Sequence, residues 1–225
     1  MSTLKAGKRR YHHGDLEAAL LRAAGKILEK EGVAALSLRE VARRAGVSHG
    51  APYRHYPGRE ALLAALAAEG FAMLGEAQRE AALVGGLRGM GEAYVVFALA
   101  HPQRFRLMFG GQVPIAPHAR LRELATKTFE GLSGALAAKL PEAQGAGDAS
   151  IAAWALVHGL AQLLLEDRIA EAARRGRSEA EFARDVLASI RFVIGTANQV
   201  AVGTANQVAA GTAKQVAVGS PQSPA

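Results

Sequence analysis

The sequence predicts an all-α fold in two parts: an N-terminal three-helix domain that contains a helix-turn-helix, and a larger helical domain after it. Apolar residues recur at helical spacing along much of the 225 residues. Only 5% of the residues are aromatic, whereas alanine and leucine are abundant. A helix with a capping residue, a glycine turn and a short polar helix follow one another between Ser37 and Gly58.

Composition and spacing divide the chain into four segments. Residues 1–10 are small, polar and cationic, and we expect a disordered basic arm that could follow phosphates or enter a minor groove. Residues 11–57 hold the helix-turn-helix domain, and residues 58–194 the second helical domain. Residues 195–225 contain the octapeptides GTANQVAV, GTANQVAA and GTAKQVAV, which predict a low-complexity tail without a readable role.

The first helix is expected to start at Gly14–Asp15, because Asp15 and Glu17 suit the positive end of a helix dipole. Gly32 ends it, since glycine readily adopts the left-handed conformation that closes many helices. The residues at helical spacing that should face a core are Leu16, Leu20, Ala23, Ile27 and Leu28.

The second helix begins after Ser37. Ser37 and Glu40 have the spacing of a capping box, in which each side chain accepts a hydrogen bond from the other residue's backbone N–H. Gly46 should end this helix. Its buried face should consist of Leu38, Val41, Ala42 and Ala45.

A short third helix is predicted from His49 to about Tyr56, with Ser48 as its cap and Pro52 in its first turn. Pro57-Gly58 ends it, and Arg59 opens the next helix. Two short helices around a glycine turn, the second polar, aromatic and cationic, are typical of a helix-turn-helix that places its second helix in the DNA major groove. An ordinary αα-corner is the alternative.

The net charge of +7 is concentrated in the same region. The first 60 residues contain twelve Lys or Arg and six Asp or Glu, which leaves a net charge of +1 for the rest of the chain. A positive excess confined to the segment with the helix-turn-helix indicates a nucleic-acid partner. We therefore expect this protein to bind double-stranded DNA.

The second domain should consist of helices throughout. The helix opened by Arg59 should run to about Leu83 and break at Val84-Gly85-Gly86. Asp148 is a candidate cap for a later helix. Further helices are expected over residues 87–100, 102–109, 118–140, 151–169 and 178–194.

The last two helices predict a homodimer. Residues 151–165 are apolar on nearly all sides, so this helix must be buried on all sides, which in a chain of this size usually needs a second subunit. Paired C-terminal helices across a two-fold axis would supply that burial. The predicted dimer contacts are Leu160, Leu164, Val186, Leu187, Ile190 and Ile194.

Several other classes of protein are disfavoured. The lack of cysteine removes disulfides, thiolate ligands and cysteine nucleophiles, and the Tyr11-His12-His13 run does not converge on one ion, so we expect no metal and no cofactor. No catalytic motif occurs at usable spacing, which disfavours an enzyme. With no secretory signal and no apolar stretch long enough to cross a bilayer, the expected location is the cytoplasm.

Residues 11–66, with the run YHHGDLEAALLRAAGKILEKEGVAALSLREVARRAGVSHGAPYRHYPGREALL, closely resemble the N-terminal domain of the TetR family of bacterial transcriptional regulators. The resemblance implies a cytoplasmic homodimer that binds a palindromic operator, usually as a repressor released by a small molecule. By the same resemblance Gly50, Ala51 and His55 face base edges, whereas Tyr53 and Arg59 grip phosphates; the family usually has Lys at the position of Arg59. The expected DNA-binding residues are Arg39, Ser48, His49, Gly50, Ala51, Tyr53, Arg54, His55, Tyr56 and Arg59.

The C-terminal part is similar to a subgroup of this family with a Trp-His-Gly signature, here Trp154, His158 and Gly159. Trp154 and His158 share a helical face and could line a pocket for an unidentified small-molecule effector. Alternatively, His158 forms a hydrogen bond within the core and Gly159 permits close helix packing. The expected pocket residues are Tyr94, Phe97, Phe105, Met108, Phe129, Trp154 and His158.

Together these features favour a sequence-specific, ligand-responsive DNA-binding regulator that acts as a repressor. One alternative is a DNA-binding protein without an effector, which a closed C-terminal core would favour and an apolar pocket would disfavour. Another is a helical carrier of apolar ligands, or an enzyme, in which the basic N-terminal segment is incidental.

Overall fold

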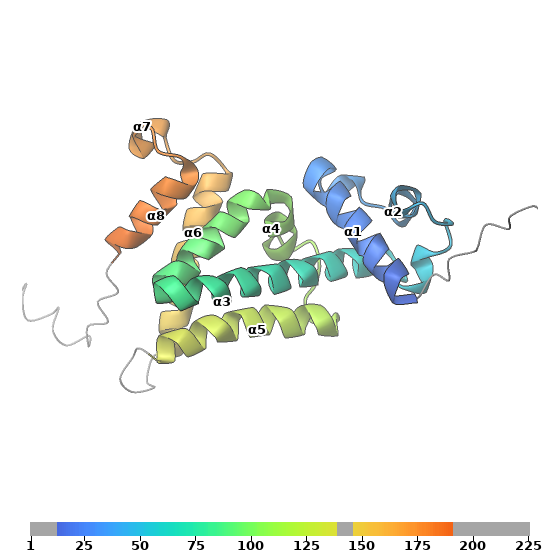
Figure 1. Cartoon of the computed structure of the whole chain (residues 1–225), viewed down its shortest axis with the longest axis horizontal. Helices are drawn as coiled ribbons and strands as arrows, with labels where there is room; N and C mark the ends of the chain where they lie inside the picture. Colours follow the sequence, from blue (N-terminus) through green and yellow to red (C-terminus); the bar gives the residue numbers. More distant parts are fainter. Residues whose placement is uncertain (1–12, 139–145, 191–225) are drawn as a thin grey trace, which may run out of the picture. The chain divides into compact units, whose positions relative to one another are not determined.

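The helices of this chain follow its sequence signals closely. The computed structural model describes residues 13–138 and 146–190, and within these residues it contains helices and no strand, as the all-α prediction requires. The elements are α1 (His13–Glu31), the 3₁₀ helix η1 (Val33–Ala35), α2 (Leu38–Ala45), the 3₁₀ helix η2 (Pro52–Arg54), α3 (Arg59–Ala100), α4 (Pro102–Phe109), α5 (Ala119–Ala137), α6 (Ala146–Leu165), α7 (Glu171–Arg174) and α8 (Glu179–Ser189) (Figure 1).

Helix boundaries coincide with the predicted caps in the N-terminal region. The Ser37 hydroxyl accepts a hydrogen bond from the Glu40 backbone N–H at 3.1 Å, and Gly46 ends α2 in the left-handed conformation with φ 69°. The second half of the predicted capping box is replaced, because the Glu40 carboxylate binds Arg43 and Arg44. Gly32 ends α1 with φ 77°.

The predicted recognition helix from His49 to Tyr56 is shorter than expected. Only the single 3₁₀ turn of η2 forms, inside a series of turns. Pro52 has no N–H to donate to the Ser48 carbonyl, and Gly50 has a low helix propensity, so an α-helix gains little here. Ser48 provides its backbone carbonyl to the Ala51 N–H, at 3.0 Å.

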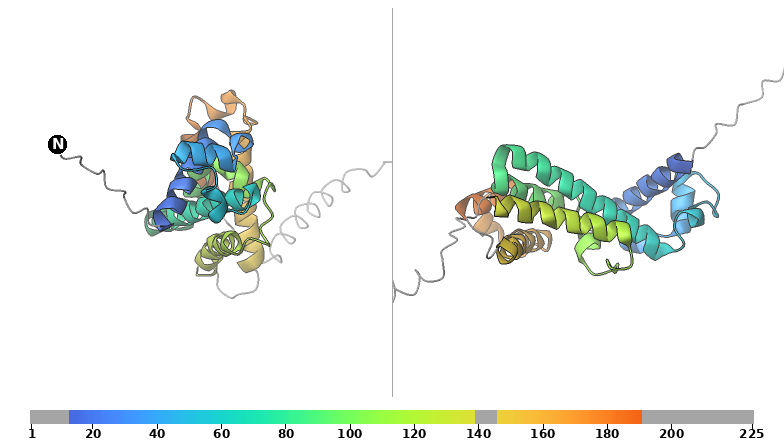
Figure 2. Two further views of the ribbon diagram at one scale, coloured as in Figure 1. Left: turned by 90° about the vertical axis from the view of Figure 1, so that its right-hand side faces the viewer. Right: turned by 90° about the horizontal axis from the view of Figure 1, so that it is seen from below.

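The long helix α3 folds back on itself at Gly86, whose φ of 57° and ψ of −141° are not helical. The predicted break at Val84-Gly85-Gly86 is thus confirmed, although only Gly86 has a non-helical backbone. The two arms lie close together: a Cβ on Gly89 would collide with the Ala81 carbonyl, and the Gln78 side chain donates to the Met90 carbonyl at 3.5 Å. Figures 1 and 2 show α5 running along the first arm.

The C-terminal helices differ from the prediction at their ends. α6 starts at Ala146, so Asp148 lies in its first turn and does not cap it. α7 was not predicted. α8 begins with a reciprocal capping box between Ser178 and Glu181. The Ser178 hydroxyl and backbone N–H both donate to the Glu181 carboxylate, and these two bonds lower the pKa of that carboxyl. Residues 191–194 of the predicted last helix and all of the predicted tail lie outside the described residues.

Buried residues of α3 belong to two cores. Residues up to Ala188 form one compact unit. α1, α2 and the start of α3 bury Leu20, Ala24, Ile27, Leu28, Leu36, Val41, Ala42, Tyr56, Leu62 and Leu66. The rest of α3 and the later helices bury Leu74, Tyr94, Val95, Phe105, Leu107, Leu121, Ala161 and Leu164.

Two of these helices, α3 and residues 147–165 of α6, are long and apolar enough to cross a membrane by length and composition alone. Core helices of soluble proteins share this property, and both helices carry residues of the core described above. The length and apolar composition of these helices therefore do not distinguish a membrane protein from a soluble one.

We expect Gly86→Ala to destabilise the protein by about 1–3 kcal/mol, because a Cβ is strained in this backbone conformation. Gly131→Ala in α5 is the matched control: a Cβ there meets nothing within 4 Å, and it should stabilise the helix by roughly 0.5–1 kcal/mol. Thermal unfolding of both variants measures the two effects. Equal changes in the unfolding temperature of the two variants would show that Gly86 is not needed for the reversal of α3.

Candidate nucleic-acid interface

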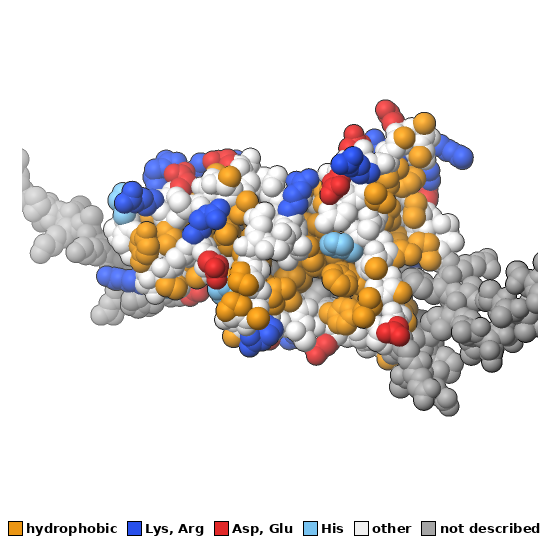
Figure 3. Space-filling view, turned by 180° about the vertical axis from the view of Figure 1, so that it is seen from behind, with side chains coloured by type: hydrophobic (Ala, Val, Ile, Leu, Met, Phe, Trp, Pro, Cys, Tyr) orange, Lys and Arg blue, Asp and Glu red, His pale blue; other side chains and the backbone are white. Residues whose placement is uncertain are grey.

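A solvent-exposed polar surface surrounds the turn between α2 and α3. Tyr53 is 53% exposed, and Gly50 lies at the surface with nothing within 4 Å of its Cβ position. Figure 3 shows Lys and Arg side chains, with some acidic ones, over the end of the molecule that carries α1 and α2. The predicted DNA-binding residues that the structure places at the surface are Arg39, Ser48, His49, Gly50, Tyr53 and Arg54, with Ala51 half-buried.

Two predicted contacts face inward and require correction. The His55 side chain is only 15% exposed, and its Nδ1 lies 3.8 Å from the Glu17 carboxylate of α1. Tyr56 is 4% exposed and belongs to the core, where burial, with the charges of Glu17 and Glu69, raises the pKa of its hydroxyl to about 12. After the single 3₁₀ turn of η2, His55 therefore lies beside Glu17 of α1 and the Tyr56 ring is buried.

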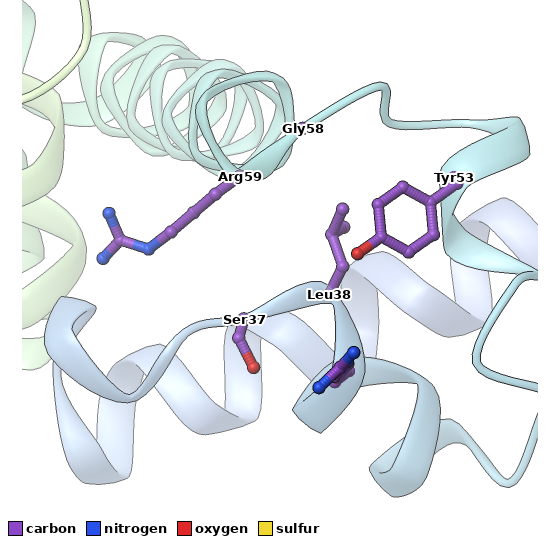
Figure 4. A pocket seen from close by; sticks show the side chains of 6 residues that line it. Ser37, Leu38, Tyr53, Gly58 and Arg59 are labelled. Carbon is purple, nitrogen blue, oxygen red and sulfur yellow. The ribbon is translucent and has the colours of Figure 1, made fainter.

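A crevice of about 290 Å³ lies between this turn and the starts of α2 and α3. Its lining residues are Ser37, Leu38, Arg39, Tyr53, Gly58 and Arg59. In Figure 4 the Tyr53 ring lies beside Leu38 with its hydroxyl directed into the crevice. Two helix N-termini meet here, and both present backbone N–H groups without intrahelical partners and the positive end of a dipole. The crevice is therefore suited to an anion.

Arg59 has a different contact from the one predicted. Its Nε donates to the Leu36 carbonyl at 2.8 Å and its Nη2 to the Val33 carbonyl at 2.7 Å. In Figure 4 the side chain runs away from Tyr53. Arg59 thus ties the start of α3 to the connection between α1 and α2, and its contact with a phosphate stays a prediction.

The exposed face of α2 is held by ion pairs. Glu40 accepts hydrogen bonds from Arg43 and Arg44, and these bonds lower the pKa of its carboxyl to about 2. Arg44 also binds Glu31 of α1 at 2.8 Å. These arginines are therefore already paired, whereas Arg39 and Arg54, in α2 and the following turn, are exposed and form no ion pair with another described residue.

The second predicted site centres on a hydrogen-bonded triad. The Trp154 indole N–H donates to the Tyr94 hydroxyl oxygen at 3.2 Å, and the same hydroxyl lies 2.8 Å from Nδ1 of His158. A neutral His158 can accept a hydrogen bond from the Tyr94 hydroxyl at Nδ1, and the burial of the ring favours this neutral form. Burial raises the pKa of Tyr94 and lowers the pKa of His158. His158 therefore forms a hydrogen bond within its own chain, and its place in an effector pocket stays a prediction.

Aromatic rings enclose this triad. The rings of Phe105 and His158 are stacked with centroids 5.4 Å apart, and Phe109 meets His158 edge-on at 5.0 Å. Phe129 contacts Trp154 at 6.2 Å, and both rings are 36% exposed at the edge of the cluster. Phe109 is a member of this cluster that was not among the predicted pocket residues.

Two other predicted pocket residues serve different contacts. Phe97 packs against the His101 ring at 5.1 Å. Met108 fills the space above Gly70, where a Cβ would collide with its sulfur. The structure therefore brings together Tyr94, Phe105, Phe129, Trp154 and His158, and it assigns Phe97 and Met108 to packing beside them.

Three of the predicted dimer contacts are buried within the single chain. Leu160, Leu164 and Leu187 face its own core, and Leu187 lies against Gly91. Val186 and Ile190 are half-buried, and Ile194 lies outside the described residues. The face of α6 that remains exposed carries instead the apolar stripe Ile151, Ala155, Gly159 and Leu163, with nothing within 4 Å of the Gly159 Cβ position.

Within the described residues, no group of three or more His, Asp or Glu side chains could hold a metal ion.

The triad predicts a pH dependence of stability. Since burial lowers the pKa of His158, the unfolded chain binds this proton at a higher pH than the folded one. The stabilising contribution is therefore complete above the unfolded pKa of about 6.5 and is lost as the pH falls below it. His158→Gln should flatten the fall in unfolding free energy between about pH 6.5 and 5. If the unfolding free energies of the wild type and His158→Gln fell in parallel with pH, His158 would not be neutral in the folded protein.

Comparisons with known proteins agree with this geometry. Residues 20–66 match the family model for bacterial regulatory proteins of the tetR family, and residues 87–190 match the model of the tetracyclin repressor-like C-terminal domain. The chain is 29% identical over 152 residues to the HTH-type transcriptional regulator Rv1816 of Mycobacterium tuberculosis. This match covers 60% of the chain and 62% of the length of that relative.

Solved structures share the fold. A protein of unknown function from Rhodococcus sp. RHA1 is 33% identical with a TM-score of 0.66, over 80% of this chain and 96% of that one. The transcriptional regulator FadR from Bacillus subtilis, solved in complex with stearoyl-CoA, is 14% identical with a TM-score of 0.58, over 78% of this chain and 100% of that one. Two family models that together span most of the chain, and a 33% identical relative aligned over nearly its full length, place this chain in the TetR family of bacterial regulatory proteins.

Proposed function

We propose that this protein is a homodimeric transcriptional regulator that binds a palindromic DNA operator and releases it when a small molecule binds its C-terminal domain. The observation that carries the proposal is the surface around the turn between α2 and α3, where the exposed Arg39, Arg54 and Tyr53 adjoin a crevice at two helix N-termini.

A phosphate of the DNA backbone suits the crevice. The starts of α2 and α3 offer backbone N–H groups, and anions bind readily at helix N-termini. Arg39, which also lines the crevice, supplies a positive charge, and the Tyr53 hydroxyl supplies a neutral donor. A phosphate held here would position the exposed segment 48–54 against the neighbouring groove. His49, Gly50 and Ala51 are then the residues nearest to base edges.

The aromatic cluster of the C-terminal domain is the proposed effector region. Trp154 and Phe129 lie at its exposed edge, and the Tyr94–His158 pair supplies polar atoms within it. Apolar walls with a few polar groups are typical of ligand sites between helices. The same fold in B. subtilis FadR accommodates stearoyl-CoA, which supports a ligand role for this domain. Trp154 is the single tryptophan of the chain, so its fluorescence reports on binding directly.

The exposed stripe on α6 is the proposed dimer surface. Figure 3 shows hydrophobic side chains gathered over the C-terminal helices. Ile151, Ala155, Gly159 and Leu163 recur every four residues, so they form one continuous face of α6. Small residues in its middle allow two copies of the helix to approach closely. A second copy of the chain would then complete the burial that the apolar sequence of α6 requires.

Selection of bound sequences from random duplexes with the full chain tests the proposal. We expect a palindrome whose half-sites are about one helical turn apart or a multiple of it, as two-fold related recognition segments require. Recovery of no enriched sequence at moderate salt, with folded dimeric protein, would refute DNA recognition.

Arg39→Ala should weaken binding to operator and scrambled duplex alike and should reduce the log–log salt slope by about 2, since each phosphate contact contributes about 0.9 and occurs twice in a dimer. Arg79→Ala is the control, because Arg79 is also exposed but pairs with Glu76 near the reversal of α3. Arg59→Ala should in addition lower stability by about 1–3 kcal/mol, since it loses two carbonyl contacts. If DNA binding by Arg39→Ala and by Arg79→Ala showed the same log–log salt slope, the crevice would not hold a phosphate.

Leu163→Arg should convert the dimer to a monomer and abolish tight operator binding, because a charge would be buried in the α6 contact. Leu83→Arg is the matched control: this leucine is 88% exposed at the reversal of α3, against 47% for Leu163, and should leave the dimer intact. Sedimentation at micromolar concentration distinguishes them. A dimeric Leu163→Arg protein would place the interface elsewhere.

A further inference from the structure

Arg104 is a charged residue in an otherwise buried position. It lies in the short helix α4, and its side chain is only 7% exposed. A guanidinium is unfavourable in such a place unless its donors are paired, so its partners determine why it is there. Among the described residues, its hydrogen-bond partners include none of those proposed above for DNA or effector binding.

Its partners come from two other helices. The Arg104 Nε donates to the Glu29 carboxylate of α1 at 3.2 Å. Its Nη1 donates to the Glu69 carboxylate at 2.7 Å and to the Leu66 carbonyl at 3.2 Å, both in α3. Glu29 also lies 3.6 Å from Nδ1 of His101, at the junction of α3 and α4. One side chain therefore links α4 with α1 and with the first arm of α3.

Two glycines make room for this side chain. A Cβ on Gly25 of α1 would lie 2.9 Å from the Arg104 Nη2, and a Cβ on Gly70 of α3 would lie 3.1 Å from its Cγ. Both glycines are in helix interiors, where glycine is unfavourable relative to alanine. Gly25 therefore makes room for the guanidinium, and Gly70 makes room for the stem of Arg104 together with Met108.

This junction controls the direction in which the DNA-binding surface faces. α1 packs on α2, and its Glu17 carboxylate lies 3.8 Å from Nδ1 of His55 in the turn segment. The later helices carry the proposed dimer surface. The angle of α1 to α3 and α4 therefore sets where each of the two recognition segments of a dimer points.

We propose that Arg104 is a positioning residue that locks the helix-turn-helix at one angle to the C-terminal domain and thereby fixes the half-site spacing that the dimer accepts. The inference rests on the proposed function, because it needs a dimer that reads two half-sites. It assigns to Arg104 no contact with DNA.

The test compares operators whose half-site spacing is the selected value or one base pair longer. One added base pair rotates a half-site by about 35° relative to the other, since the duplex repeats every 10–10.5 base pairs. The variants are Arg104→Met, which removes the charge, and Gly25→Ala, which displaces the guanidinium sterically. The controls are Arg106→Met, an exposed arginine of the same helix that binds the Leu165 carbonyl, and Gly131→Ala.

We expect the wild type and both controls to lose roughly tenfold or more in affinity on the longer operator, the scale of one mismatched base pair. Arg104→Met and Gly25→Ala should lose less than about threefold, while keeping the same half-site sequence preference. A role in stability alone would not change the spacing preference. Unchanged spacing profiles in the two variants overturn the inference, whereas a wild type that binds no operator refutes the proposed function.

Folding is checked by circular dichroism before each titration. If Arg104→Met does not fold, Glu69→Gln replaces it, since this substitution keeps the side-chain volume and removes the ion pair. If none of Arg104→Met, Gly25→Ala and Glu69→Gln folds, Arg104 is required for the fold itself, and its assignment as a positioning residue is overturned.

Discussion

The first arm of α3 is the element on which the rest of the structure depends, because its residues belong to two cores. The Leu66 side chain lies 3.9 Å from the Cβ position of Gly25 in α1, and the Phe71 carbonyl, less than two turns further along, accepts a hydrogen bond from Thr128 of α5. A continuous helix is stiff over this distance, so a rotation of one core is transmitted to the other. The Gly86 reversal then returns the chain along the same arm, which allows α4 to reach α1.

A few hydrogen bonds to this arm therefore help to set the orientation of the N-terminal helices. Two arginines hold the first arm of α3. Arg59, at its start, donates to the Leu36 carbonyl, and Arg104 of α4 donates to the Leu66 carbonyl within the arm. Hydrophobic packing alone is not directional. Hydrogen bonds from a planar guanidinium fix both distance and angle, which is what a DNA reader needs from the junction between its two parts.

The sequence predicts helix positions well because local signals determine them. Ser37, Gly46, Pro102 and Gly86 each act on the backbone within one turn of their own position, and the structure has boundaries or breaks at all four. The segment after Gly46 is different. Pro52 and Gly50 leave one 3₁₀ turn in place of a helix, and a periodicity of 3.6 then assigns the wrong face to His55 and Tyr56.

Periodicity also cannot identify which partner buries an apolar face. Leu160 and Leu164 have the spacing of an interface but are buried by their own chain, whereas Ile151 and Leu163 on the same helix stay exposed. Similarly, the sequence places Tyr94 and His158 on inward faces, 64 residues apart, but not in hydrogen-bonding distance. Such pairings depend on the tertiary packing of α3 against α6, which no local pattern determines.

The most direct test of this account is hydrogen–deuterium exchange of the full chain with and without its selected operator duplex. The central claim is that DNA lies against the starts of α2 and α3 and the turn between them. It predicts slower exchange of backbone amides at residues 38–39 and 48–54 on binding, with no change at the exposed reversal around Leu83 and Val84. Bound duplex without protection of residues 48–54, or with protection confined to the C-terminal helices, would contradict it.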